Sequence, residues 1–348
     1  MNKVLALIGN RLRRGHAVVV LFFFPIFQSA CVGLEVTEPQ QRAADVVMEE
    51  ITQCRFDRAR MLTDSMIAAD SAEPLYWMLS LCAEALRQLD NAEISDPDAF
   101  TPLYERSKKN MPAWDHCTTK RKSYLMTMKG FMQLVAAAHT MQRKSYWSGL
   151  RLGLGAVSLC NEAKQLDTLN RDADLVGGLY NYARAELKRK FFGILFWYPG
   201  NKEAGMETIR RCSHDARIVA ITSEMILQEI YTRENMMDSA AIGISRLLER
   251  YPGCRFILWT KAKMLDAQKA YKASAQTYQA LADAYAAAPG AIHSRSLTRL
   301  YEAQRYYAAG DNIRAKAACT LLLDSCKTSS SDQCSEAKKL LKKIEKAR

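Results

Sequence analysis

The sequence predicts an all-α protein whose helices stack as an α-solenoid of antiparallel helix hairpins, and two observations lead to this fold class. First, the apolar positions of residues 237–251 recur 34 residues later in residues 271–285, each copy with the spacing 4, 3, 3, 1 and 3 of one helix face. Second, the 348 residues are 49% hydrophobic but include only 9 prolines and 16 glycines, and few stretches alternate polar with apolar residues. A helix pair of this period cannot cover its own apolar face, so copies must stack on one another.

Four parts are expected along the chain. Residues 1–30 are predicted to be a signal peptide of the lipoprotein type, and residues 31–37 a short tether. Residues 38–200 are predicted to be a helical region with degenerate repeats, and residues 201–348 a region of regular repeats. The boundary near residue 200 rests on the change from long, irregularly spaced helices to the 34-residue rhythm.

Apolar periodicity predicts fifteen helices after the tether, over residues 38–53, 56–69, 74–90, 98–109, 115–141, 145–166, 171–191, 202–213, 216–233, 236–251, 254–269, 271–287, 291–309, 311–326 and 332–346. Local signals separate them. Pro74 and Pro97 each begin a helix, because proline disfavours helical geometry in the preceding residue. The pairs 252–253 and 289–290, both Pro-Gly, end helices, and Gly310 separates two more. Because these connections are short, neighbouring helices are expected to pack antiparallel.

The amino-terminal segment has the features of an export signal. Four basic residues and no acidic residue precede an 11-residue apolar run, residues 17–27, which is too short to span a bilayer as a helix. The small residues before Cys31 resemble a bacterial lipobox, although Gln28 stands where leucine is usual. We expect acylation of Cys31 as the first mature residue, with ordinary cleavage nearby, for example after Gly33, as the alternative.

Charge is spread along the remaining chain. The formal net charge is +12 for the whole sequence and +8 without the four basic residues of the signal segment. Basic and acidic residues are interleaved, which disfavours nucleic acid as a partner. The exception is residues 338–348, which hold five lysines and one arginine. A solvated helix face with Leu340, Leu341 and Ile344 turned inward explains this run, and contact with an anionic surface, such as membrane headgroups or an acidic partner, is the alternative.

The cysteines point to packing and one possible disulfide. Nine remain after Cys31, so at least one thiol of a monomer stays unpaired. No CxxC motif and no cysteine–histidine cluster with zinc spacing occurs, so no metal and no cofactor are expected. Cys326 and Cys334 flank a polar turn and can form a disulfide in an oxidising compartment.

A short pattern marks the start of several predicted helices. Residues 237–240 (Met-Asp-Ser-Ala), 271–274 (Tyr-Lys-Ala-Ser) and 56–59 (Phe-Asp-Arg-Ala) each place a large residue three positions before a small one, and Pro252 closes the first of these helices. This pattern resembles the tetratricopeptide repeat of exported bacterial proteins, which implies a superhelical scaffold and transfers no catalytic residue. The residues expected to pack the repeats together are Met237, Ala240, Ala241, Tyr271, Ser274, Ala275 and Ala315.

Candidate contact residues are aromatic, because tryptophan and tyrosine are favoured at interfaces. The segment 191–198 is the densest aromatic patch after the signal segment, and core packing at a helix end is its alternative explanation. Gly149 and Gly153 lie four residues apart and are expected to permit close helix packing. The residues proposed to contact a partner are Tyr180, Tyr182, Trp197, Tyr198 and Trp259.

These features together predict a non-enzymatic protein-interaction scaffold on the periplasmic side of a bacterial envelope, lipid-anchored in the outer membrane. The sequence contains no nucleophile elbow, phosphate loop, HExxH or calcium loop. Two alternatives stay open at this point. One is an envelope enzyme or carbohydrate-binding protein built on a helical toroid, which needs carboxylates converging in an aromatic cleft. The other is a membrane-surface adaptor that uses the basic carboxyl-terminal helix.

Overall fold

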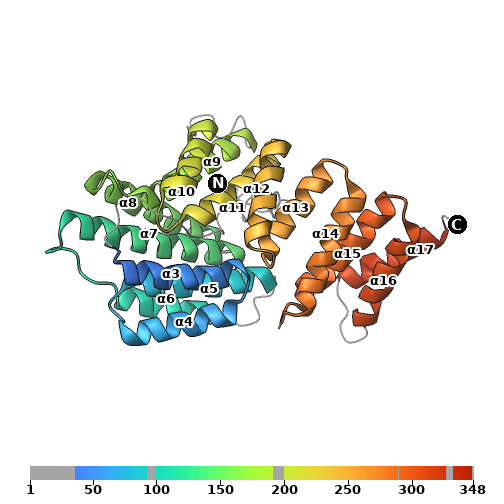
Figure 1. The fold of residues 1–348 in the computed structure, drawn as a ribbon, viewed down its shortest axis with the longest axis horizontal. Coiled ribbons are helices and arrows are strands. Elements are labelled where there is room, and N and C mark those ends of the chain that lie inside the picture. The colour runs from blue at the N-terminus through green and yellow to red at the C-terminus, as the bar shows by residue number, and fades with distance from the viewer. Residues whose placement is uncertain (1–35, 92–98, 191–199, 289, 327–331, 347–348) are drawn as a thin grey trace. The chain divides into compact units, whose positions relative to one another are not determined.

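The computed structural model describes residues 36–91, 99–190, 200–288, 290–326 and 332–346. Within these ranges the chain forms fifteen α-helices and no β-strand, one helix in each predicted segment, so the all-α fold class is confirmed. No helix there combines the length and the apolar character that crossing a membrane requires. The helices, labelled as in Figure 1, are α3 (Glu38–Thr52), α4 (Phe56–Ala69), α5 (Pro74–Asn91), α6 (Phe100–Lys109), α7 (Thr119–Gln142), α8 (Tyr146–Leu166), α9 (Arg171–Lys190), α10 (Lys202–Asp215), α11 (Ala220–Arg233), α12 (Met237–Arg250), α13 (Arg255–Ala267), α14 (Tyr271–Ala286), α15 (Ile292–Ala308), α16 (Asn312–Ser325) and α17 (Asp332–Lys346).

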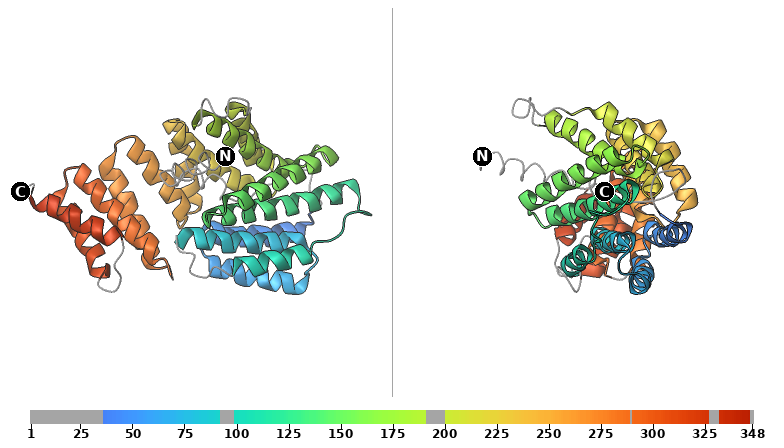
Figure 2. Two further views of the ribbon diagram at one scale, coloured as in Figure 1. Left: turned by 180° about the vertical axis from the view of Figure 1, so that it is seen from behind. Right: turned by 90° about the vertical axis from the view of Figure 1, so that its left-hand side faces the viewer.

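Helices that follow one another in sequence also pack against one another. This holds for α7 with α8, α8 with α9, α9 with α10, and for the run from α12 to α17. Figure 2 shows the same succession by colour, with orange α14 and α15 side by side. Packing of each helix on its chain neighbours is the arrangement of an α-solenoid.

The chain divides into two compact units. Unit 1 comprises the described residues up to Ile51, Arg55–Leu86 and those from residue 99 to Leu227, and unit 2 comprises Thr52–Cys54, residues 87–91 and those from Gln228 onward. The boundary expected near residue 200 therefore falls inside unit 1. Close packing of α9 against α10, which lie on either side of residue 200, explains this position. The helices are so close that a Cβ on Gly205 would lie only 2.7 Å from the backbone nitrogen of Tyr182.

Five helix pairs share one turn: α3–α4, α7–α8, α11–α12, α13–α14 and α15–α16. In each, a residue with positive φ stands two positions before the second helix, namely Cys54, Lys144, Asn235, Lys269 and Gly310, with φ of 57–78°. The next residue donates its backbone N–H to the carbonyl five positions earlier, which is the hydrogen bond of a Schellman helix end. These bonds run from Arg55 to Glu50, Ser145 to Thr140, Met236 to Tyr231, Ala270 to Leu265 and Asp311 to Tyr306, with lengths of 2.8–3.1 Å.

The fourth residue of the second helix is small and buried in all five pairs. In the α7–α8 and α13–α14 pairs, this residue lies against the residue twelve positions earlier in the first helix. A Cβ on Gly149 would lie 2.9 Å from the carbonyl oxygen of Ala137, and Ser274 Oγ donates to the carbonyl oxygen of Ala262 at 3.4 Å. A larger side chain at this position would push the two helices apart. The five residues are Ala59, Gly149, Ala240, Ser274 and Ala315.

Two helices of unit 1 begin later than the sequence predicts, and a polar side chain explains each case. Thr118 Oγ1 accepts the N–H of Arg121 at 3.2 Å, so α7 begins at Thr119 instead of residue 115. Asp172 on α9 accepts the N–H groups of Arg217, Ile218 and Val219 at 3.1, 2.5 and 2.8 Å. These three residues therefore lie before α11, which begins at Ala220 instead of residue 216.

Unit 2 ends in a helix with an apolar and a basic face. Ala337, Leu340 and Ile344 of α17 are buried with residues of α15 and α16, and Leu341 is partly buried beside them. The lysines at 338, 339, 342, 343 and 346 are exposed, as a solvated helix face requires, and Arg348 lies outside the described residues.

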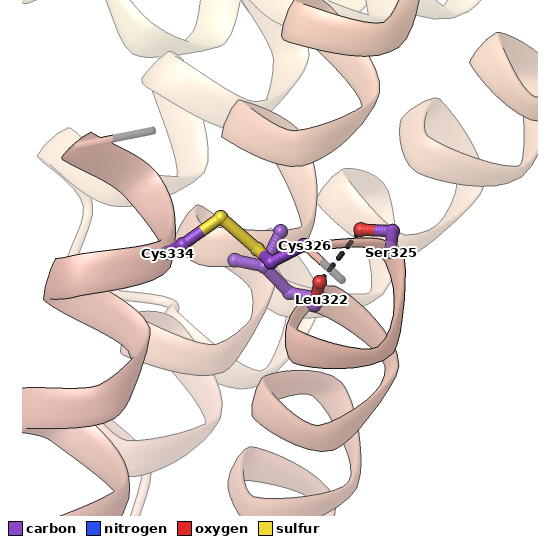
Figure 3. Close-up of a disulfide and its surroundings, with 4 residues drawn as sticks. All are labelled: Leu322, Ser325, Cys326 and Cys334. Atoms are coloured by element: carbon purple, nitrogen blue, oxygen red, sulfur yellow. Dashed lines mark hydrogen bonds between the residues drawn. A yellow bond between two sulfur atoms is a disulfide. The ribbon is translucent and has the colours of Figure 1, made fainter. Parts of the chain in front are cut away.

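A disulfide joins the last two helices of unit 2. Cys326, directly after α16, and Cys334, within α17, are bonded to each other, with their Cα atoms 6.1 Å apart (Figure 3). Ser325 Oγ donates to the carbonyl oxygen of Leu322 at 2.6 Å and ends α16 beside the bridge. The pairing that the sequence allows is thus present.

Candidate functional site

Helix α8 carries an exposed apolar face. Trp147, Leu150 and Leu154 are 59%, 42% and 42% exposed, and no other described helix has three large apolar side chains exposed to this extent. Their spacing of three and four residues places them on one side of the helix. Single exposed apolar residues are ordinary, whereas a contiguous group marks a candidate interaction surface.

The sequence of α8 explains why this face is free. The residues that α8 buries are small ones, Gly149, Ala156, Cys160 and Ala163. Small residues let the axis of α8 approach α7 closely, as Gly149 shows by its contact with Ala137. Gly153 does not share this role, since a Cβ there would meet only the Cβ of Ala137 at 3.9 Å. With its small side chains turned inward, α8 presents its large ones to solvent.

A cleft of about 180 Å³ lies where α8, α9 and α10 meet, all within unit 1. Asn161 stands one heptad after Leu154, so the apolar face of α8 leads along the helix towards this cleft. Gly177 and Gly178 leave part of its α9 side without side chains. The lining residues are Asn161 and Lys164 from α8, Ala173, Asp174, Gly177, Gly178 and Asn181 from α9, and Thr208 and Arg211 from α10.

The cleft has more positive than negative charge. Lys164 Nζ lies 2.7 Å from Asp174 Oδ2, and Arg171 Nη1 lies 3.6 Å from the same oxygen. Arg211 Nη2 contacts Thr208 Oγ1 at 3.5 Å and has no carboxylate in the lining besides Asp174. The lining thus holds two cations, Lys164 and Arg211, and one carboxylate, Asp174, which Arg171 also contacts; two asparagine amides add uncharged donors. Such a site attracts an anionic group.

The cleft holds one carboxylate and no aromatic ring among its lining residues. Two carboxylates in an aromatic-lined cleft, the arrangement that glycoside chemistry requires, are therefore not found at this place. Across the described ranges, no group of three or more His, Cys, Asp or Glu side chains is arranged to hold a metal ion.

The aromatic residues proposed as partner contacts lie in different environments. Tyr182 is 1% exposed and packs in the core of unit 1, so its ring offers no surface to a partner, which corrects that expectation. Tyr180 is half-buried, with the Arg184 guanidinium 5.1 Å from its ring centroid. Trp197 and Tyr198 lie outside the described residues.

Trp259 belongs to an aromatic cluster of unit 2. Its ring contacts those of Tyr278 and Tyr301, with centroids 5.6 and 6.0 Å away, and its Nε1 donates to Tyr285 Oη at 2.9 Å. Trp259 is half-buried, and this hydrogen bond makes it part of the internal structure of unit 2.

The residues expected to pack the repeats are mostly buried. Ala240, Ser274, Ala275 and Ala315 are buried, whereas Met237, Ala241 and Tyr271 are half-buried. The α8 face is not among the sequence-predicted contact residues, because the glycines of residues 147–154 indicate helix packing and its only aromatic residue there, Trp147, lies outside the aromatic patch at 191–198. One sequence signal does point to this face. Along α8, small residues recur every three or four positions on one side of the helix, and large apolar residues recur at the same interval on another side.

Comparison with known proteins gives no relative from which a site can be transferred. Neither a protein-family model nor a curated protein matches the sequence.

Proposed function

We propose that the protein is a non-enzymatic scaffold that binds another protein through helix α8. The observation that carries the proposal is the exposed apolar face of Trp147, Leu150 and Leu154, which leads to a cleft with an excess of positive charge. The partner that fits is a protein segment with apolar side chains followed by a carboxylate. The apolar side chains lie on α8, and the carboxylate binds among Lys164, Arg211 and the asparagine amides.

The energetics favour an interface centred on Trp147. Burying a large apolar side chain contributes roughly 1.5–3 kcal/mol, and tryptophan is enriched among the residues that dominate binding. The cleft is small compared with the 300–1,000 Å³ that is typical of drug-sized ligand sites. It therefore suits an end group or a single acidic side chain of a partner better than a whole small molecule.

The repeated architecture supports a scaffold role. The shared turn and the small fourth residue of five helix pairs agree with the resemblance to tetratricopeptide repeats. Repeat arrays of this kind present extended surfaces that are suited to binding proteins. We therefore propose that the chain is a scaffold of the tetratricopeptide type, and we propose no catalytic role.

We further propose that the scaffold is exported and anchored by a lipid on Cys31. The basic and apolar pattern of residues 1–30 supports export, and the disulfide between Cys326 and Cys334 fits an oxidising compartment. Expression with an alkyne-labelled fatty acid tests the anchor. The label should appear in the membrane fraction for the parent chain and disappear for Cys31→Ser. Equal labelling of both proteins would contradict lipidation.

Binding through α8 is tested by placing a photo-crosslinking amino acid at Leu154 of the full chain. Illumination of cell envelopes should yield one discrete crosslinked protein species. The matched control is the same amino acid at Ile242 of α12, an isolated apolar side chain that is 69% exposed. The proposal fails if Leu154 gives no discrete species or the same pattern as Ile242.

A further inference from the structure

The α3–α4 turn and the start of α13 are joined by hydrogen bonds across 200 residues of sequence. The N–H of Gly253 donates to Gln53 Oε1 at 3.1 Å, and Arg255 Nη2 donates to the carbonyl oxygen of Cys54 at 3.3 Å. Residues 52–54 and 253–255 belong to the same compact unit, unit 2. These contacts hold residues 53–54 beside residues 253–255.

Two thiols meet at this junction. The Cys54 thiol donates to the carbonyl oxygen of Thr52 at 3.8 Å, and the Cys254 thiol lies close enough to interact with it. Cys54 is 7% exposed and Cys254 is fully buried. Cys54 is the positive-φ residue of its turn, and Cys254 is the N-cap residue of α13. Both backbones are thus fixed by local structure, which keeps the pair together.

The residues around the two cysteines also hold Cys54 beside Cys254. Arg255, which holds the carbonyl of Cys54, is itself paired with the buried carboxylate of Asp90 at 2.5–3.2 Å. Other buried thiols have different partners. The thiol of Cys82 contacts Met78 Sδ at 3.5 Å, and that of Cys212 contacts the carbonyl oxygen of Arg171 at 3.5 Å. Those two cysteines serve as internal controls.

We propose that Cys54 and Cys254 are a disulfide-forming site, at which oxidation by an external disulfide links the α3–α4 turn covalently to the start of α13. This bridge would be separate from that of Cys326 and Cys334 and would close a far longer loop. It does not depend on what the α8 face binds.

The chemistry is two successive thiol–disulfide exchanges. One cysteine thiolate attacks a sulfur of an external disulfide such as oxidised glutathione, forms a mixed disulfide and releases one glutathione thiolate. The second cysteine thiolate attacks the cysteine sulfur of that mixed disulfide, so the Cys54–Cys254 bond forms and a second glutathione thiolate leaves. The two cysteines lose two protons and two electrons, and glutathione disulfide takes up both to give two thiols.

Burial sets the rate of this reaction. Burial is the largest cause that raises the pKa of the Cys54 thiol well above its ordinary value, so little thiolate exists in the closed structure. The external disulfide must also reach a buried sulfur. Oxidation is therefore slow in the folded protein and accelerates when the α3–α4 turn opens.

Peptide mapping tests the proposal on the full chain carrying Cys31→Ser. The protein is first reduced, then incubated in a buffer of oxidised and reduced glutathione, quenched with acid, and alkylated under denaturing conditions before proteolysis. The expected result is a peptide pair joined through Cys54 and Cys254, which disappears on reduction and has lost about 2 Da relative to the two thiol peptides. Cys82 and Cys212 should be alkylated throughout.

The Cys326–Cys334 bridge shows in the same sample that the oxidant has worked. Full alkylation of Cys54 and Cys254 in a sample where Cys326 and Cys334 are joined would overturn the proposal. A lasting glutathione adduct on Cys54 or Cys254, or a disulfide between Cys54 and another cysteine, would overturn it as well. The variant Cys54→Ser should leave Cys254 alkylated, whereas Cys82→Ser should leave the new bridge intact. Because the decisive map uses the protein without either of these substitutions, a folding defect of a variant does not obscure the result.

Discussion

Arg255 and Asp90 form a buried ion pair between residues 165 positions apart in the sequence. Arg255 Nε donates to both carboxylate oxygens of Asp90, at 3.2 and 3.0 Å, and Nη2 donates to Oδ2 at 2.5 Å. Tyr285 Oη donates to the same carboxylate at 2.9 Å, and Ser294 Oγ donates to the backbone carbonyl of Asp90 at 2.6 Å. Within unit 2, the carboxylate of Asp90 thus links the end of α5 to α13 and α14, and its backbone carbonyl links it to α15.

Removing one partner of this pair should destabilise the protein strongly. Asp90→Asn leaves the Arg255 charge buried without its counter-charge, and the loss of either partner of a buried pair costs about 3–5 kcal/mol. Chemical denaturation monitored by helical circular dichroism measures the change. Asp90→Asn with Arg255→Met should lose less than the sum of the two single changes. The exposed pair of Glu207 and Arg210 is the control, and Glu207→Gln should leave the denaturation midpoint unchanged.

Two glycines of α8 should respond in opposite directions to the same substitution. Gly149→Ala places a methyl group against the carbonyl oxygen of Ala137 and should destabilise the fold by about 1–3 kcal/mol. Gly153→Ala places its methyl group in ordinary contact with the Cβ of Ala137, at 3.9 Å, and should stabilise the helix by about 0.5–1 kcal/mol. Thermal denaturation of both variants measures the difference. If both changes have the same sign, the close approach of α8 to α7 is wrong.

His139 should make the fold sensitive to acid. Its ring stacks on Phe100 with centroids 4.1 Å apart, and burial, assisted by the charge of Arg143, lowers its pKa to about 4. The folded state therefore favours the neutral ring. Stability from this residue is present above the unfolded pKa of about 6.5 and is lost as the pH falls towards 4, by at most about 3 kcal/mol. Urea denaturation as a function of pH should show that the free energy of unfolding falls less at acid pH for His139→Gln than for the parent.

Asp172 should act in the opposite direction over part of the same range. Burial raises its pKa to about 6 despite the hydrogen bonds from Arg217, Ile218 and Val219. Because the folded pKa lies above that of the unfolded chain, stability from this carboxyl group is present below about pH 4 and is lost as the pH rises to about 6, by at most about 3 kcal/mol. Relative to Asp172→Asn, the parent should therefore become less stable as the pH rises through this window. A difference that stays constant with pH would contradict the buried position of Asp172.

Most of the fold was predictable because helices leave a local signal. Apolar periodicity located all fifteen helices of the described residues, and a small residue three positions after a large one identified three of the five pairs that share the Schellman turn. The α15–α16 pair lacks the pattern because Asn312 stands at the large position, and the α7–α8 pair was missed because its small residue, Gly149, is neither alanine nor serine. The late starts of α7 and α11 have different causes. Thr118 is a local cap, whereas the carboxylate of Asp172 comes from another helix 45 residues away, which no local pattern reveals.

The candidate site was much less predictable. Aromatic residues such as Tyr182 serve both cores and interfaces, and the sequence alone does not show which side of a helix is covered. The cleft combines Lys164, Asp174 and Arg211 from three helices, so its charge balance depends on packing. The same holds for Cys54 and Cys254, which meet only after unit 2 has formed.

If the protein is a scaffold that binds through α8, a partner protein covers the α8 face in the cell envelope. Hydroxyl-radical footprinting tests it directly by comparing the purified protein with the same protein in intact envelope preparations. We predict that Trp147 is readily oxidised in the purified protein and several-fold less in envelopes, while Met61, an isolated side chain that is 71% exposed, is oxidised equally in both. Equal oxidation of Trp147 in the two preparations would contradict the claim.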